Sequence, residues 1–227
     1  MMNRNPEEQK HRIMIPSYTL GEELISSISH GVGALMGIVG LILCVVKGAY
    51  AHDAWKIVSG SIFGAMIILL YLMSCLYHAF KVNKAKRVFR VIDHCTIFLL
   101  IAGTYTPYTL VAIREQNLLL AWVVFGIIWG VAITGIVLNA VNLKKFAKIS
   151  VACYLLMGWM VVLAYGPMSR AIPQPGIALL VWGGVVYSIG AALYAIGSKK
   201  RYFHSIFHFF CLGGTFLHFL SIYLYVL

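Results

Sequence analysis

Long apolar stretches separated by short polar segments are the feature that most constrains how this chain can fold. About 20 apolar residues let a helix cross the ~30 Å hydrocarbon layer of a membrane. The 227 residues are 61% hydrophobic and 11% charged, a composition typical of membrane proteins. The predicted fold is all-α, a polytopic membrane protein with a bundle of seven transmembrane helices, at 26–46, 57–79, 92–113, 118–140, 149–166, 177–197 and 203–226.

The positions of Lys and Arg predict the orientation of these helices. The formal net charge of +11 alone would suit a nucleic acid or another acidic partner. The basic residues, however, gather in the segments between helices, and 14 of the 18 share one side of the predicted bundle. This asymmetry predicts a cytoplasmic N-terminus, an external C-terminus, a place in the cell membrane and no nucleic-acid partner. The 14 are Arg4, Lys10, Arg12, Lys81, Lys84, Lys86, Arg87, Arg90, Lys144, Lys145, Lys148, Lys199, Lys200 and Arg201.

The domain organisation is simple, because the loops between apolar stretches are short. We expect a short cytoplasmic segment, residues 1–25, followed by one seven-helix transmembrane domain, residues 26–227. The first 25 residues lack the apolar core and cleavage site of a secretory signal, so no segment is expected to be removed. The five cysteines lie singly in separate apolar stretches, which favours small packing residues over a disulfide framework.

Glycine and proline positions predict local features of the bundle. Glycines at helical spacing, such as Gly33 and Gly64, predict faces where two helices approach closely. The same reading applies to Gly126 and Gly130. Pro107 lies inside the third stretch and should kink it, because proline removes one backbone hydrogen bond.

Five polar residues at the ends of apolar stretches form the candidate site. Ser74 and His78 are four residues apart, as are His204 and His208, so each pair shares one helix face. In the predicted topology one helix ends near His78, the next has Asp93 in its first turn, and the last begins near His204. All five therefore meet at the cytoplasmic end. Ionisable residues inside membrane spans are costly, which favours a function for them.

The residue types point to a zinc ion. Three imidazoles with a water in the fourth position are a ligand set of catalytic zinc. We expect His78, His204 and His208 to bind the metal, and Asp93 to hold the water or act as general base. Ser74 would hold the water or the substrate carbonyl. Alternatively, its hydroxyl bonds to the backbone of its own helix, four residues back.

The other titratable residues are weaker candidates. His30, at the start of the first helix, is a candidate for a hydrogen-bonding partner behind the metal ligands. Glu23, near the positive end of the same helix, is equally explained by the helix dipole. His94 points about 100° away from Asp93 around the helix. His218 lies ~21 Å along the helix from His204, so we expect it to form an interhelical hydrogen bond instead.

Four segments of the sequence resemble the progestin and adipoQ receptor family, and in particular its bacterial haemolysin III branch. They are EELISSISHGVG, SCLYHAF, DHCTIFLLIAGTYTPYT and HSIFHFFCLGGTFLHF, and together they cover nearly the whole chain from Glu23. The resemblance implies that His78, His204 and His208 are zinc ligands, with Asp93 as the acidic residue near the metal-bound water. It also implies that Ser74 is the family's serine of the second helix, and that Glu23 and His30 occupy its first-helix positions.

The resemblance extends to adiponectin receptors and, more distantly, to alkaline ceramidases. It implies a zinc-dependent hydrolase of a membrane lipid amide or ester, with a ceramide-like or fatty-acyl substrate. The haemolysin name implies a different function, lysis of cells. A third alternative is a non-enzymatic protein of membrane homeostasis with structural zinc, although structural zinc normally has four protein ligands. A channel is disfavoured, because the polar residues cluster at one end.

Overall fold

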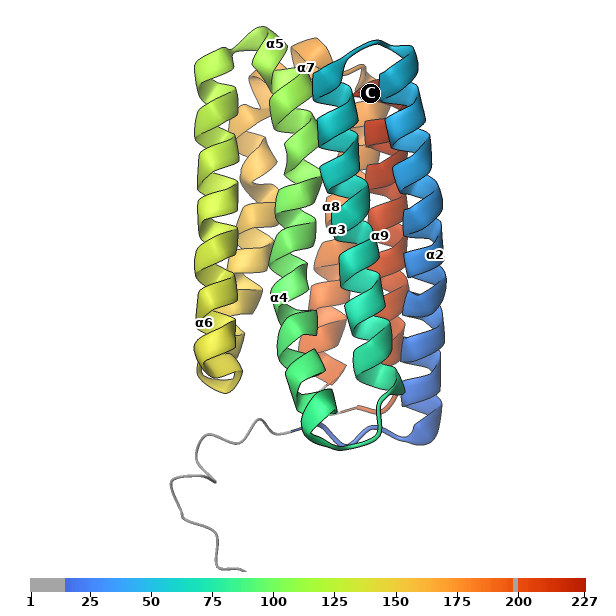
Figure 1. Cartoon of the computed structure of the whole chain (residues 1–227). Helices are drawn as coiled ribbons and strands as arrows, with labels where there is room; N and C mark the ends of the chain where they lie inside the picture. The colour runs from blue at the N-terminus through green and yellow to red at the C-terminus, as the bar shows by residue number, and fades with distance from the viewer. Residues whose placement is uncertain (1–14, 198–199) are drawn as a thin grey trace, which may run out of the picture.

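The structure is a computed structural model that describes residues 15–197 and 200–227. These residues form a bundle of long helices that run roughly parallel to one another (Figure 1). Of the 14 clustered basic residues, Arg4, Lys10, Arg12 and Lys199 lie outside the described part, as do residues 1–14 of the expected N-terminal segment. The elements are α2 (Leu20–Tyr50), α3 (Ala54–Ala79), α4 (Lys84–Pro107), the π-helix η1 (Tyr108–Ile113), α5 (Arg114–Gln116), α6 (Leu118–Trp159), the 3₁₀-helix η2 (Met160–Ala164), α7 (Tyr165–Ala171), α8 (Gln174–Gly197) and α9 (Phe203–Tyr225).

The prediction of seven transmembrane helices was wrong in its count. In the described part of the chain, six helices are long and apolar enough to cross a membrane. The expected helices at 118–140 and 149–166 are not separated by a loop but belong to one helical element, α6. Its single residue with non-helical backbone angles is Asn142 (φ −158°, ψ 87°), where the chain turns back (Figure 1). The Asn142 side chain accepts a hydrogen bond from the Lys145 backbone N–H at 3.0 Å, which restarts the helix at once.

The first helix begins at Leu20 rather than at residue 26, because a capping box starts it early. The Thr19 hydroxyl accepts a hydrogen bond from the Glu22 backbone N–H at 3.3 Å. In return, the Glu22 carboxylate accepts one from the Thr19 N–H at 2.8 Å. This reciprocal pair satisfies two backbone groups that a bare helix end leaves unpaired.

Helix α4 also begins early, at Lys84 rather than at residue 92. The Asn83 side chain caps it by accepting a hydrogen bond from the Lys86 backbone N–H at 2.9 Å. Asp93 therefore lies about two and a half turns inside the helix and not in its first turn. Lys86, Arg90 and Asp93, spaced four and three residues apart, consequently share one face of α4.

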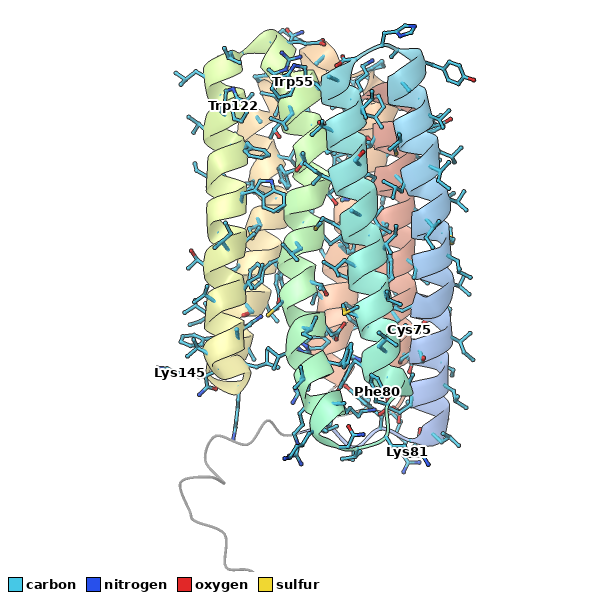
Figure 2. The ribbon with its side chains drawn as sticks, in the orientation of Figure 1. Trp55, Cys75, Phe80, Lys81, Trp122 and Lys145 are labelled. Carbon is cyan, nitrogen blue, oxygen red and sulfur yellow. The ribbon has the colours of Figure 1, made fainter. Side chains whose placement is uncertain are left out.

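The two ends of the bundle differ in composition. We call the end where α2, α4 and α9 begin, and where α6 turns back, the basic end. Lys81 and Lys145 lie there, whereas Trp55 and Trp122 lie at the opposite end (Figure 2). The described chain ends at Leu227, also at the opposite end (Figure 1). The expected gathering of basic residues at one end is thus present, and the cytoplasmic placement of that end stays a prediction.

Close packing at glycine is confirmed between α2 and α3. A Cβ atom added to Gly64 would lie 2.7 Å from the Cα atom of Leu41, so a side chain there would separate the two helices. The same prediction was wrong for Gly126 and Gly130 in α6, where an added Cβ would have no described neighbour within 4 Å.

The irregularity expected at Pro107 is present. Regular α-helical geometry ends at this residue, and the chain continues as the π-helix η1. A wider helical turn of this kind accommodates the missing backbone donor of proline. Tyr105 and Tyr108, on either side of Pro107, line the cavity described below.

Candidate metal centre

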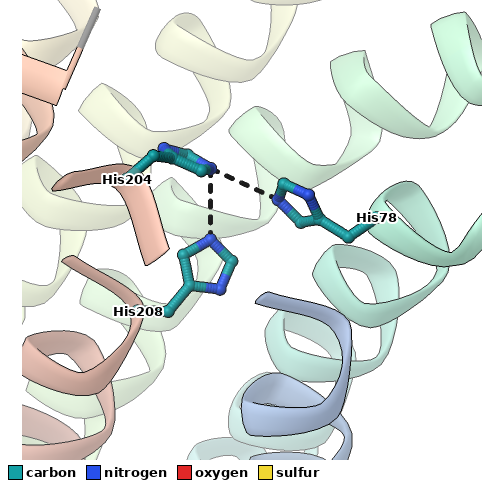
Figure 3. A group of neighbouring side chains, drawn as sticks. All are labelled: His78, His204 and His208. Atoms are coloured by element: carbon teal, nitrogen blue, oxygen red, sulfur yellow. Dashed lines mark hydrogen bonds between the residues drawn. The ribbon is translucent and has the colours of Figure 1, made fainter. Parts of the chain in front are cut away.

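Three histidine rings from α3 and α9 meet near the basic end of the bundle. The Nε2 atom of His204 lies 3.3 Å from Nε2 of His78 and 3.2 Å from Nε2 of His208 (Figure 3). One ligand atom from each of the three lies within 4.8 Å of the other two, and all three residues are buried. His204 and His208 reach the same point because they are four residues apart on α9.

Two charged side chains, Glu23 and Lys86, form a hydrogen-bonded chain that orients the ring of His78 through its Nδ1 atom. Its Nδ1 atom lies 2.7 Å from Oε2 of Glu23 on α2. The other oxygen of Glu23 lies 2.6 Å from the Nζ atom of Lys86 on α4. Because a carboxylate only accepts hydrogen bonds, Nδ1 of His78 is the donor and its Nε2 keeps a free lone pair. Lys86 is buried and also donates to the backbone oxygen of Phe80 at 3.0 Å.

The three imidazoles fit a zinc ion in donor type and spacing. Tetrahedral zinc with bonds of about 2.0–2.1 Å to nitrogen separates neighbouring ligand nitrogens by about 3.3 Å. The two nitrogen separations at His204, 3.3 and 3.2 Å, have this size. The carboxylate behind His78 is the partner that metal-binding histidines usually have, since it fixes the tautomer and orients the ring.

His30 lies directly against the cluster. Its ring stacks on that of His208, with the ring centroids 3.8 Å apart, and meets the Tyr71 ring edge-on at 4.8 Å. Both ring nitrogens of His30 and Nδ1 of His208 are buried without a hydrogen-bond partner among the described residues. The structure therefore places His30 in ring contact with His208 and not hydrogen-bonded to it, and its role as a partner of a metal ligand stays a prediction.

Asp93 and Ser74 line a cavity that the cluster borders. The cavity has a volume of about 180 Å³ and lies inside the bundle, with walls from every long helix. His30, His204 and His208 also line it, whereas most other lining residues are apolar or aromatic. The hydroxyl of Ser74 makes no hydrogen bond with any described residue, so the alternative bond to its own helix is not formed in this structure.

Two further histidines line the same cavity. His94 was expected to point away from the site, but it lies on the cavity wall with its Nε2 atom 3.3 Å from the hydroxyl of Tyr194. Its Nδ1 atom lies 3.6 Å from a carboxylate oxygen of Asp93. The interhelical hydrogen bond expected of His218 is confirmed, because its Nε2 atom lies 3.0 Å from the backbone oxygen of Leu180.

Sequence reasoning missed Lys86 and Tyr18. The charge pattern treated Lys86 as one of many basic loop residues, although the capping residue Asn83 would have placed it inside a helix on the face of Asp93. Tyr18 stacks on the ring of His204, with the centroids 4.8 Å apart, and covers the cluster from the basic end. No pattern in the sequence indicated this contact, because Tyr18 precedes the helix.

The fold and the site define a class: an integral, multi-pass helical membrane protein with a buried three-histidine cluster that could hold a metal ion. The chain matches the family described as haemolysin-III related over residues 18–219, and it belongs to that family. The resemblance found in the sequence motifs is thereby confirmed.

Relatives of known name support this assignment. Hemolysin-3 of Bacillus cereus is 37% identical over 206 residues, which cover 91% of this chain and 92% of that protein. The hemolysin-3 homolog of Bacillus subtilis (strain 168) is 38% identical over 198 residues, covering 87% and 91%. More distantly, an adiponectin receptor protein of Drosophila melanogaster is 28% identical over 192 residues, 72% of this chain and 41% of that protein. No solved structure matches the chain.

Proposed function

We propose that this protein is a zinc-dependent hydrolase that cleaves an amide or ester bond of a membrane lipid, ceramide-like or otherwise fatty-acylated. The observation that carries the proposal is the meeting of three imidazoles, two of which, His204 and His208, line a mainly apolar cavity that Asp93 and Ser74 also line. A structural zinc site would normally offer a fourth protein ligand, and within the described residues only three gather here.

His78, His204 and His208 would hold the metal, and Glu23 would keep His78 in the tautomer that leaves Nε2 free. The chemistry supplied by a bound zinc ion is Lewis acidity, which polarises a carbonyl group and lowers the pKa of water. The remaining requirements fall to the chain itself. It must bind the lipid, exclude bulk water and move a proton.

Asp93 would accept that proton. It lies inside α4 on the wall of the cavity that the histidines border, and its side chain is only 14% exposed. Ser74, one turn before His78 on α3, would donate a hydrogen bond to the carbonyl oxygen of the substrate or hold the water. Positioned acid–base groups of this kind contribute roughly 10²–10⁴-fold to a rate.

The walls of the cavity suit an acyl chain. Lining residues such as Leu70, Ile97, Leu100 and Phe207 offer apolar contact. Burial of a methylene group on such a surface contributes about 0.8 kcal/mol. The cavity would therefore bind the tail of a lipid while its amide or ester group lies at the cluster.

Metal analysis combined with turnover tests the proposal. The purified protein is expected to contain about one zinc ion per chain and to release fatty acid from short-chain ceramides or esters. His208→Ala should lose both, whereas His52→Ala, outside the cavity, should lose neither. Full turnover of every responsive lipid by His208→Ala would reject the hydrolase.

The name of the two Bacillus relatives suggests a rival function, membrane lysis. In the described part of the chain six helices are long and apolar enough to cross a membrane, and a protein with such helices should remain in its own membrane, which does not suit a secreted lysin. The protein can be added to dye-filled lipid vesicles that contain no other protein. Dye leakage that is the same for the unsubstituted protein and for His208→Ala would favour lysis over hydrolysis.

A further inference from the structure

A second, more polar hollow lies at the basic end of the bundle. It has a volume of about 820 Å³ and is lined by the segment before α2 and by parts of α4, α6, α8 and α9. It shares His94, Tyr194 and His204 with the inner cavity, so these side chains form the wall between the two. The inner cavity on one side of this wall is mainly apolar, whereas the hollow on the other side is lined by charged residues.

The charge in the hollow is strongly positive. Four basic residues line it: Arg90, Lys148, Lys200 and Arg201. Its single acidic lining residue in the described chain is Glu22. That carboxylate accepts hydrogen bonds from Thr19 and from the Tyr202 backbone N–H, the latter at 2.7 Å, and its single negative charge leaves the lining positive overall.

Arg90 is the member of this group that lacks a partner while being partly buried. Its Nε atom is buried without a hydrogen-bond acceptor, and its guanidinium forms no ion pair with any described residue. Lys86, one turn earlier on the same face, has a carboxylate and a carbonyl oxygen as partners. A buried donor left unpaired costs about 1–3 kcal/mol, and more if it is charged. Guanidinium groups recognise carboxylates and phosphates through paired hydrogen bonds.

We propose that the hollow is a binding site for an oxyanion, a carboxylate or a phosphate, with Arg90 as its principal contact. The site borders the metal centre at His204, and binding there requires no turnover. Tyr18 also lines it, and its hydroxyl group is a further hydrogen-bond donor. Lys148, Lys200 and Arg201 add attraction that salt screens over about 8–10 Å.

Calorimetric titration of the purified full-length chain in neutral detergent tests the site. The probes are octanoate, octyl phosphate and inorganic phosphate, with 1-octanol as the uncharged comparator. Octanoate and octyl phosphate should bind, 1-octanol should bind at least about tenfold more weakly, and binding should weaken as salt rises.

Arg90→Gln should weaken anion binding at least about tenfold, because one charged hydrogen-bonding group is lost. The matched control is Arg87→Gln: Arg87 lies on the same helix and also has a buried Nε without a partner, but it does not line the hollow. The anion affinity of this control variant should stay within about twofold of that of the unsubstituted protein. If Arg90→Gln unfolds, Arg90→Lys keeps the charge without the planar donor pair and should still bind more weakly.

The outcomes separate the sources of the anion. If inorganic phosphate binds as tightly as octyl phosphate, the natural ligand is a free anion. If octanoate and octyl phosphate bind but inorganic phosphate does not, the natural ligand is an anionic lipid. Equal binding of 1-octanol, or equal losses in Arg90→Gln and Arg87→Gln, would overturn the site. His208→Ala should abolish turnover and leave octanoate binding unchanged, so failure of the hydrolase and failure of this site are distinguishable.

Discussion

Glu23 and Lys86 form an ion pair of 2.6 Å that joins the first helix of the bundle to α4. The same carboxylate holds His78, so a lysine that does not touch the cluster determines where one of its rings points. Removing either Glu23 or Lys86 leaves the charge of the other side chain largely buried and without this partner.

Lys86→Met should destabilise the protein by about 3 kcal/mol. Loss of one partner from a buried pair costs roughly 3–5 kcal/mol, and the partial exposure of Glu23 favours the lower value. Unfolding followed in detergent measures the change. Lys84→Met, at an exposed position of the same helix start, should change stability by less than about 0.5 kcal/mol. Equal effects of the two substitutions would contradict the role given to Lys86.

Glu23→Gln should lower the affinity for zinc about 10–100-fold, because the amide no longer fixes the tautomer of His78. Competition with a chelator of known affinity measures the zinc affinity of each variant. Glu22→Gln is the control, since Glu22 caps α2 and does not contact the histidines. Gln also accepts the hydrogen bond of the capping box, so this variant should change stability by less than about 1 kcal/mol and leave metal affinity unchanged. An equal fall in affinity for both variants would contradict a specific role of the contact between Glu23 and His78.

Asp93→Asn should reduce lipid turnover about 10²–10⁴-fold while zinc content stays the same. The amide keeps the shape of the side chain but cannot take up a proton. Thr104→Val, at another position on the cavity wall, should have a much smaller effect. Loss of zinc in Asp93→Asn would instead make this residue part of the metal-binding set.

Ser74→Ala should slow turnover and leave stability within about 0.5 kcal/mol, because the hydroxyl has no hydrogen-bond partner among the described residues. Thermal unfolding measures the stability and a lipid assay measures the turnover, both on the same sample. A loss of about 1 kcal/mol of stability with unchanged turnover would favour a bond to the helix backbone after all.

Gly135→Ala should destabilise the bundle by about 1–3 kcal/mol, since the new Cβ would lie 2.2 Å from the Phe98 ring. Gly126→Ala in the same helix has open space and should be neutral or stabilising by up to about 1 kcal/mol. Unfolding of the two variants under one condition compares them directly. The reverse order of stability would contradict the packing of α6 on α4.

Spacing and apolar length predicted much of this molecule, because both depend on local periodicity. They identified the membrane class, the pairing of His204 with His208 and the meeting of His78 with both. The start of α4 could not be predicted in this way, because it depends on one side-chain hydrogen bond from Asn83. That error hid the shared face of Lys86 and Asp93.

The helix count was wrong for a related reason. A loop was expected at 141–148, but this segment contains good helix formers and neither Gly nor Pro, and only Asn142 departs from helical backbone angles there. Contacts between distant segments, such as Tyr18 over His204, depend on how the whole bundle packs. Single-sequence patterns do not contain that information.

Helix α9 carries two of the three clustered imidazoles, and it is the last element of the chain. Its Ser205 hydroxyl lies 3.1 Å from that of Ser26, so it packs beside the first helix. Ribosomal synthesis delivers the chain from its N-terminus. During biogenesis the cluster therefore stays incomplete until Phe203–Tyr225 has left the ribosome and docked. A nascent chain interrupted before this point carries His78 alone, so metal acquisition would distinguish copies that contain α9 from copies that lack it.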